Sequence, residues 1–300
     1  MGRPRDATQT EAVSLKIPAR LEVTCATTAG TTAWLDRLSA VVGDLAGRWL
    51  LTLGASLDDG ETNCSWVAPA VRADGTRAVL KLAIPHFEGK HAIDGLRFWS
   101  GNPTVRLLES DESVGAMLLE RCEPGSSLRA EPEPEQDRVI ARLLQRLWRS
   151  PQAGHPFRPL SEMATHWAAE ALARRDHWHD HALVAEGLSL FGELSRSRSA
   201  DVLLATDLHA GNVLRAEREP WLVIDAKPFV GDPAYDATQH LLNCRARLLS
   251  HPRDTIRRLA DLLDANADTV RRRTFARLAL ESATDAFPGA AEALARKVGS

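Results

Sequence analysis

A carboxylate, an amide and a second carboxylate lie close together in the second half of the sequence. Asp207 and Asn212 belong to one short polar stretch, and Asp225 follows an apolar run that ends at Ile224. Phosphoryl transfer from ATP needs a carboxylate beside the attacking hydroxyl and oxygen ligands for Mg²⁺. The pattern therefore predicts that Asp207 faces a substrate hydroxyl as the catalytic base, while Asn212 and Asp225 bind Mg²⁺.

Longer stretches around these residues resemble a known family. The sequence reads LLATDLHAGNVL over 203–214, WLVID over 221–225 and KPFVGDPAYD over 227–236. Shorter matches precede them, with VLKL at 79–82, LRFW at 96–99, VRLL at 105–108 and LLER at 118–121. In this order and spacing they resemble the aminoglycoside phosphotransferases, in particular the branch of the streptomycin 6-phosphotransferases and hydroxyurea phosphotransferases. The resemblance extends from about Ile17 into the C-terminal helices.

The resemblance implies a protein-kinase-like fold and an ATP- and Mg²⁺-dependent transfer to a hydroxyl of an aminoglycoside, streptomycin above all. It implies that Lys81 holds the nucleotide phosphates and that the segment 119–122, with Glu120 and Cys122, is the hinge that binds adenine. The alternatives are an ordinary solvent-exposed lysine at a strand end and a plain strand end at 119–122. The segment 57–66 contains no G-x-G-x-x-G motif. It is either the hairpin that covers the phosphates, with Thr62, Asn63 and Ser65 as donors, or a plain surface hairpin.

Two positions depart from the family pattern. Ala92 stands where relatives place the glutamate that pairs with the phosphate-binding lysine, so Glu88 or Asp94 is the expected substitute. Ala205 and Thr206 stand where many relatives have His-Gly before the catalytic aspartate. These departures support the alternative of a nucleotide-binding pseudoenzyme, whereas the presence of the predicted base and both metal ligands argues against it. A second alternative is the same chemistry on another hydroxyl, that of hydroxyurea or a metabolite.

Two further aspartates follow the metal aspartate in a turn and at a predicted helix start. Asp232 and Asp236 are predicted to bind a cationic acceptor, because streptomycin-like molecules carry guanidinium groups that carboxylates recognise through paired hydrogen bonds. The competing interpretation is that they cap a helix, and it is favoured for Asp236.

Other polar residues are assigned structural roles. His209 is predicted to bond the loop backbone, and Gly211 to adopt a loop position that a side chain would obstruct. His177 and His181 lie one helical turn apart, but no third metal ligand is near them in the sequence, so an exposed polar helix is favoured. The arginine run 271–273 is predicted to be a solvated helix face.

The elements around these residues predict two lobes. A helix is predicted over 34–50, strands over 50–53, 66–71 and 78–82, a helix over 90–99, and strands over 105–108 and 116–119. An Asp74-Gly75 pair predicts a tight hairpin turn. Turn residues cluster at 123–127, and helical patterns dominate after them. The expected fold is α+β and bilobal, with an antiparallel-sheet, nucleotide-binding lobe over 1–122 and a helical lobe over 123–300 that holds the catalytic loop and the acceptor site.

Composition excludes several other classes of protein. The chain of 300 residues carries 37 basic and 40 acidic side chains, and this net charge of -3 gives no general attraction to nucleic acid. No apolar run is long enough to span a membrane, and the first ten residues are polar, so a cytoplasmic protein is expected. The four cysteines stand singly and are predicted to be reduced thiols. The partners that the resemblance implies are a nucleotide and an aminoglycoside-like small molecule, and the oligomeric state stays open.

Overall fold

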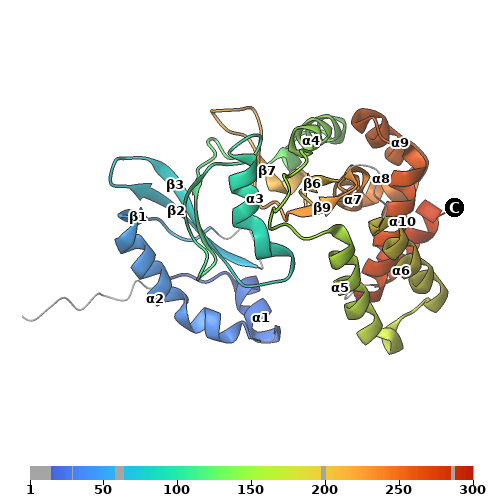
Figure 1. Ribbon diagram of the computed structural model, residues 1–300, viewed down its shortest axis with the longest axis horizontal. Coiled ribbons are helices and arrows are strands. Elements are labelled where there is room, and N and C mark those ends of the chain that lie inside the picture. The colour runs from blue at the N-terminus through green and yellow to red at the C-terminus, as the bar shows by residue number, and fades with distance from the viewer. Residues whose placement is uncertain (1–14, 29, 58–63, 197–200, 285–287, 300) are drawn as a thin grey trace, which may run out of the picture. The chain divides into compact units, whose positions relative to one another are not determined.

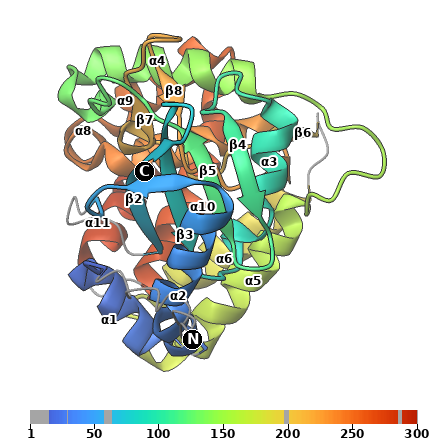
Figure 2. The same ribbon diagram turned by 90° about the vertical axis from the view of Figure 1, so that its left-hand side faces the viewer.

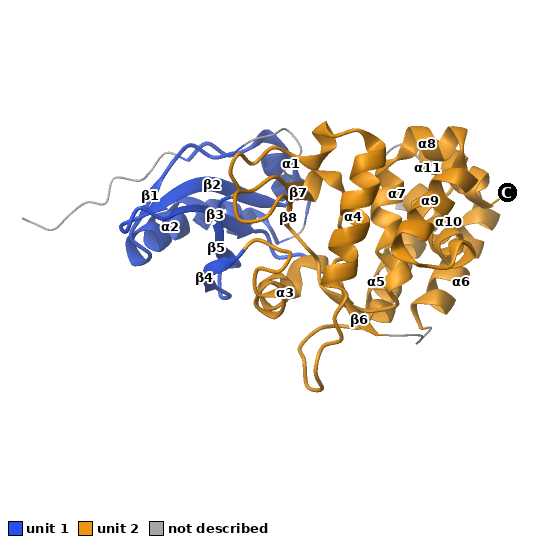
Figure 3. Cartoon of the chain, turned by 90° about the horizontal axis from the view of Figure 1, so that it is seen from above, with its two compact units in different colours: residues 1–87, 106–121 blue, residues 88–105, 122–300 orange. Residues whose placement is uncertain are grey.

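The computed structural model describes residues 15–28, 30–57, 64–196, 201–284 and 288–299. The chain divides into two compact units, coloured separately in Figure 3. Unit 1 comprises Met1–Phe87 and Arg106–Arg121, and unit 2 comprises Glu88–Val105 and Cys122–Ser300. The division after residue 121 lies next to the predicted boundary at 122, whereas the segment 88–105 belongs to the other unit.

Unit 1 is built on a five-stranded antiparallel sheet with the order β1-β2-β3-β5-β4 (Figure 2). The strands are β1 (Leu51–Leu53), β2 (Ser65–Arg72), β3 (Arg77–Ala83), β4 (Leu107–Asp111) and β5 (Ala116–Glu120). At the turn between β2 and β3, the Asp74 carboxylate accepts a hydrogen bond from the Thr76 backbone N–H, and Gly75 has a φ of +84°. The predicted sheet and its Asp-Gly hairpin are therefore confirmed.

Two helices complete unit 1, α1 (Ala19–Thr27) and α2 (Thr32–Arg48). The apolar stripe of α2, with Leu38, Val42 and Leu45, packs on the sheet in one core. The sequence predicted a helix over 34–50, and each end of α2 lies two residues before the predicted one. The sequence pattern did not predict α1, because this short helix buries only Leu21 and Cys25.

Unit 2 is mostly helical (Figure 1). Its helices are α3 (Ala92–Trp99), α4 (Glu133–Leu147), α5 (Leu160–Ala173), α6 (His181–Ser195), α7 (Ala237–Asn243), α8 (Arg245–Ser250), α9 (Pro252–Leu263), α10 (Ala267–Thr284) and α11 (Pro288–Gly299). The helices α5, α6 and α10 pack against one another, and a Cβ added to Gly187 of α6 would lie 2.4 Å from Cβ of Ala279 in α10. Among the described residues, no helix is both long and apolar enough to cross a membrane.

Two small ribbons interrupt the helices of unit 2. Strand β6 (Val202–Leu204) pairs with β9 (Phe229–Gly231), and β7 (Val213–Leu214) pairs with β8 (Leu222–Val223). Their loops carry the predicted catalytic and metal-binding residues. These ribbons lie in the same core as α4, α7 and α10.

Segment 88–105 belongs to unit 2 because its side chains and backbone bond there. Trp99 is 1% exposed and donates from Nε1 to the carbonyl of Leu147, at 3.0 Å. The backbone N–H of Val105 donates to the carbonyl of Val223, also at 3.0 Å. The sequence of this helix does not indicate which of the two cores it packs against. The contacts of Trp99 and Val105 place the segment in unit 2.

Candidate active site

The loop between β6 and β7 holds the predicted catalytic base. Thr206 has a φ of +48°, which turns the chain sharply before Asp207. The Asp207 backbone N–H donates to the carbonyl of Ala205 at 2.7 Å, and the Asp207 carbonyl accepts from Nδ2 of Asn212 at 2.9 Å. Both bonds use the backbone of Asp207, so the loop is fixed independently of the carboxylate that would face a hydroxyl.

The pairing of β7 with β8 brings the two predicted metal ligands together. Val213 pairs with Val223, and the backbone N–H of Ile224 donates to the carbonyl of Asn212 at 2.9 Å. Asp225 therefore follows directly on the residue that bonds Asn212, and its φ of +56° turns the chain away from the strand. Because Nδ2 of Asn212 is used within the loop, Oδ1 is the atom of its amide that suits a cation.

These residues fit a magnesium ion. A carboxylate and an amide oxygen are the hard donors that Mg²⁺ binds in nucleotide enzymes, usually with water and phosphate completing its shell. The Asp225 carboxylate lies 2.5 Å from Nζ of Lys227, so it already faces one positive charge. Asp225 and Asn212 would hold the metal, and the metal would neutralise charge on the transferred phosphate.

Asp236 fastens the catalytic loop. Its carboxylate accepts from the backbone N–H groups of Ala205 (3.0 Å) and Thr206 (2.8 Å), and from Nε1 of Trp148 (2.9 Å). The residue is 1% exposed, and burial raises the pKa of its carboxyl to about 6, although the three donors favour the ionised form. These contacts support the structural interpretation of Asp236. The acceptor contact predicted for it stays a prediction.

Asp232 also has structural partners. One carboxylate oxygen accepts from the backbone N–H of Ala234 at 2.8 Å, and the other lies 3.0 Å from Nη2 of Arg273. Arg273 is 1% exposed, so the predicted solvated face of the arginine run is wrong at this position. Arg271 and Arg272 do lie at the surface, about one third exposed, and pair with Asp268 and Glu193. The reason is that α10 packs between other helices and turns one arginine inward.

We expect Asp232→Asn to destabilise the fold. The amide oxygen can still accept from Ala234, but the buried Arg273 loses its counter-charge. An unpaired buried charge of this kind costs about 3–5 kcal/mol. Denaturant unfolding of the variant measures this loss. If the stability were unchanged and the KM for the acceptor alone rose tenfold or more, Asp232 would be an acceptor contact instead.

The structural roles predicted for His209 and Gly211 are confirmed. The backbone N–H of Gly211 donates to Nδ1 of His209 at 3.0 Å. A Cβ on Gly211 would lie 2.7 Å from Cε1 of His209 and 2.8 Å from Cζ of Arg129, so a side chain there would clash. His209 therefore shapes the loop that joins the base to the metal ligands.

The residues predicted to bind the nucleotide are divided between the units. Lys81 lies in the middle of β3, opposite Val67 and Met117, while Ser65 begins β2 opposite Ala83. Glu120 ends β5, and its carboxylate accepts from the backbone N–H of Arg106 at 3.0 Å. Cys122 begins the second stretch of unit 2. Thr62 and Asn63 lie outside the described residues. The nucleotide contacts of these residues stay predictions.

Both acidic residues considered as partners of the lysine have partners within unit 2. Glu88 accepts a hydrogen bond from Nε1 of Trp167 at 2.8 Å. Asp94 lies 3.0 Å from Nδ1 of His91. Ala92, at the position expected to carry glutamate, is the first residue of α3. The compensating ion pair with Lys81 stays a prediction.

A buried polar cluster joins α4 to α7 and α8. Asp137, His240 and Cys244 place their polar atoms within 4.8 Å of one another, and they are the one such group of three among the described residues; His177 and His181 are exposed and outside it. Arg247 donates to both carboxylate oxygens of Asp137 at 2.8 Å and to Sγ of Cys244 at 3.0 Å. Its guanidinium occupies the place of a cation, so this cluster stabilises the fold and does not suit a metal.

We expect this cluster to make stability fall at alkaline pH. Burial opposes a charge on His240, but the hydrogen bond to Asp137 outweighs it and raises its pKa from 6.5 to about 9. Because the folded-state pKa is the higher one, the stabilisation is complete below pH 6.5 and disappears as the pH rises through about 9. The loss amounts to up to about 3 kcal/mol. Denaturant unfolding across this range should show the slope in the natural chain and not in His240→Gln, and an equal slope in both would contradict the assignment.

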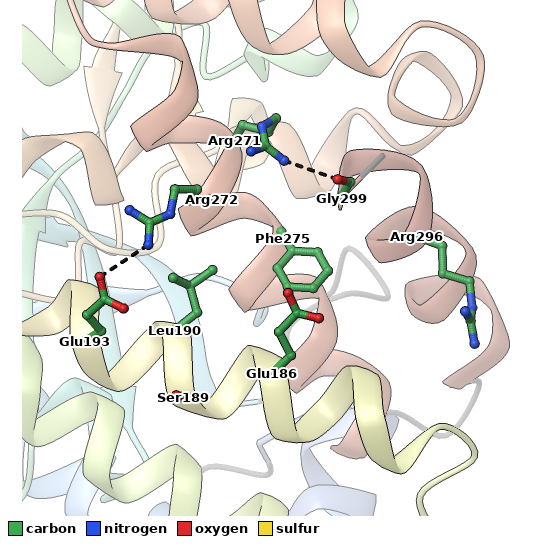
Figure 4. Close-up of a pocket in the computed structure, with 9 residues that line it drawn as sticks. All are labelled: Glu186, Ser189, Leu190, Glu193, Arg271, Arg272, Phe275, Arg296 and Gly299. Atoms are coloured by element: carbon green, nitrogen blue, oxygen red, sulfur yellow. Dashed lines mark hydrogen bonds and ion pairs between the residues drawn. The ribbon is translucent and has the colours of Figure 1, made fainter.

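A separate cavity of about 710 Å³ lies between α6, α10 and α11 (Figure 4). Its charged side chains pair locally, Arg272 with Glu193 at 3.2 Å and Arg271 with the carbonyl of Gly299 at 3.4 Å. None of the predicted site residues lines it. It is therefore distinct from the catalytic loop.

Sequence reasoning missed two residues whose contacts hold the site. Lys227 bonds the carboxylate of Asp225, and its backbone N–H donates to the carbonyl of Ala205 at 2.8 Å. Its place two residues after the metal aspartate was the available signal. Trp148, which bonds Asp236, belonged to an apolar stripe and carried no signal of a polar role.

The sequence is similar to characterised kinases over most of its length. A family model described as aminoglycoside/hydroxyurea antibiotic resistance kinase matches residues 48–289. A streptomycin 6-kinase of Streptomyces griseus is 39% identical over 256 residues, 82% of each chain. One from Streptomyces glaucescens is 42% identical over 208 residues, 68% of this chain and 66% of that protein. A hydroxyurea phosphotransferase of Kitasatospora aureofaciens is 38% identical over 216 residues, 70% of this chain and 62% of that protein.

Solved structures show the fold. A choline kinase from Streptococcus pneumoniae superposes with a TM-score of 0.63 at 10% identity, covering 87% of this chain and 98% of that one. An aminoglycoside phosphotransferase in a ternary complex with AMP-PNP and hygromycin B gives 0.57 at 16% identity, over 86% and 98%. At these identities the likeness concerns the fold alone, and it confirms the predicted α+β, protein-kinase-like class.

Proposed function

The chain belongs to the aminoglycoside/hydroxyurea antibiotic resistance kinases, and we propose that it transfers the γ-phosphoryl group of ATP to a hydroxyl of streptomycin. The family membership confirms the resemblance seen in the sequence and a phosphotransfer to a hydroxyl group. The identity of the acceptor rests on the relatives named streptomycin 6-kinase. Since the donor is a nucleotide, the reaction would take place in the cytoplasm.

One observation carries the proposal, namely the series of hydrogen bonds that joins the proposed base to the proposed metal ligands. Asp207 and Asn212 are bonded within one loop, and Asn212 is bonded to the residue before Asp225. In a loose phosphoryl-transfer transition state little covalent work falls to the protein, so catalysis comes from positioning and from charge. A loop held by these bonds that carries the proposed base and is joined to both proposed metal ligands would supply both.

The roles divide among this chain's own residues. Asp207 orients the acceptor hydroxyl and takes up its proton as the bond to phosphorus forms. Asn212 and Asp225 would hold Mg²⁺, which would neutralise charge on the phosphates, and Lys81 would position the nucleotide phosphates. Asp236 keeps the loop in place through the two backbone N–H groups before Asp207.

The proposal is tested by supplying ATP, Mg²⁺ and candidate acceptors to the purified chain. Mass spectrometry should show one added phosphoryl group on streptomycin, and omission of Mg²⁺ should abolish it. Phosphorylation of hydroxyurea but not of streptomycin would identify hydroxyurea as the acceptor, as in the name of the relative from Kitasatospora aureofaciens. Nucleotide binding without any transfer to either acceptor would favour the pseudoenzyme interpretation.

A further inference from the structure

A small cavity between α5 and α10 has the composition of a cation site. It measures about 130 Å³ and is lined by Trp167, Glu170, Arg277, Leu280 and Glu281. All five belong to unit 2. An aromatic ring, two carboxylates and one guanidinium therefore meet in one place.

The ring of Trp167 is held on two sides. Its Nε1 donates to the carboxylate of Glu88 at 2.8 Å, and its ring stacks nearly parallel on Phe191, with centroids 5.7 Å apart. The guanidinium carbon of Arg277 lies 3.9 Å from the centroid of the same ring. This is the geometry of a cation–π contact, for which guanidinium groups and tryptophan are the favoured partners.

Apart from its contact with the Trp167 ring, the guanidinium of Arg277 has few polar partners. Within the described part of the chain it forms no ion pair, and its one hydrogen bond runs to Oε1 of Gln239 at 3.5 Å. Glu281 pairs through Oε1 with Nη2 of Arg245 at 3.4 Å, whereas its Oε2 is buried and no donor among the described residues reaches it. The cavity therefore contains carboxylate capacity that its resident cation does not use.

The cavity is connected to the catalytic loop by direct contacts. Phe191, which stacks on Trp167, lies 6.0 Å from the ring of Tyr235 between centroids. Both rings are buried, Phe191 at 2% and Tyr235 at 0% exposure, so this link runs through the core of unit 2. Tyr235 directly precedes Asp236, whose carboxylate bonds the backbone N–H groups of Ala205 and Thr206, so the packing behind the cavity is continuous with the support of the catalytic loop.

We infer that this cavity is a guanidinium subsite of the acceptor site, that Arg277 fills it when no acceptor is bound, and that a guanidino group of the acceptor displaces Arg277. The inference rests on the proposed function in taking streptomycin, a guanidino sugar, as the acceptor. The incoming group gains the face of Trp167 and the unused oxygen of Glu281. Arg277 acts on the acceptor by occupying its place, so it is a specificity-determining residue and not a catalytic one.

The inference is tested most directly by whether removing Arg277 raises or lowers the affinity for a guanidinium ligand. When a side chain of the protein fills a site, the apparent affinity for a ligand equals the intrinsic affinity multiplied by the fraction of time that the site is empty. Arg277→Gln should therefore bind agmatine, a one-guanidinium probe, several-fold more tightly than the natural chain, as measured by calorimetry without nucleotide. The affinity for 1,5-diaminopentane should increase less in this variant, because an ammonium group lacks the planar, forked geometry of a guanidinium group. Arg272→Gln, on the same helix but paired with Glu193, is the matched control and should change neither.

A second pair of variants tests the aromatic face. Trp167→Leu should raise the KM for streptomycin about tenfold or more while leaving the KM for ATP unchanged, and Trp167→Phe, which keeps an aromatic face, should raise it less than about threefold. Weaker or unchanged agmatine binding by Arg277→Gln would overturn the inference, as would equal effects of the leucine and phenylalanine variants. If the natural chain does not phosphorylate streptomycin, the proposed function fails; the agmatine measurement still decides the subsite.

Discussion

Asp207→Asn should lower kcat by about 10²–10⁴-fold, the usual contribution of a positioned proton acceptor. The amide has almost the same shape but does not take up the hydroxyl proton. The bonds that fix the loop use the backbone N–H and carbonyl of Asp207, so both persist in the variant. The KM values for ATP and acceptor should therefore stay close to those of the natural chain.

Steady-state kinetics with each substrate varied separately measures this effect. Thermal unfolding serves as the control, and an unchanged transition would show that the loop is intact. A fall in kcat of less than tenfold would mean that Asp207 is not the base, and attention would turn to the remaining carboxylates of the loop region.

Asp225→Asn should lower kcat by about 10²–10³-fold at moderate Mg²⁺, the scale found for removing one preorganised electrostatic group. Asparagine is chosen over alanine because Asp225 has a φ of +56°, a conformation that asparagine tolerates and alanine does not. The variant keeps an oxygen ligand but removes the anionic one. Raising the Mg²⁺ concentration should restore part of the activity.

Lys227→Met is the matched comparison for this site. Nζ of Lys227 lies 2.5 Å from the Asp225 carboxylate, so removing it should leave the carboxylate more available and lower the Mg²⁺ concentration needed for half activity. The two variants should thus shift the Mg²⁺ requirement in opposite directions. A Mg²⁺ titration of Asp225→Asn that matches the natural chain would show that the metal binds elsewhere.

The sequence by itself determined the class of fold and the order of the polar residues in the loop. Asp207, Asn212 and Asp225 stand at spacings that depend on local chain geometry, a loop followed by a two-stranded hairpin, and the structure joins them through that hairpin. The sheet of unit 1 was equally predictable, because strand alternation and the Asp74-Gly75 turn are local signals. These features were predictable because each depends on residues that are close together in the sequence.

Only the tertiary structure decided which charged residues turn inward and what they meet. Asp232 and Arg273 are far apart in the sequence, and their ion pair depends on how α10 packs in unit 2. The same packing brings Arg277 onto the ring of Trp167 in α5. The helical period shows that a face is buried but not which partner covers it, because that depends on contacts between residues distant in the chain. For this reason the order and local pairing of the loop residues were predictable from the sequence, while the cavity lined by Trp167 and Arg277 emerged only from the packed helices.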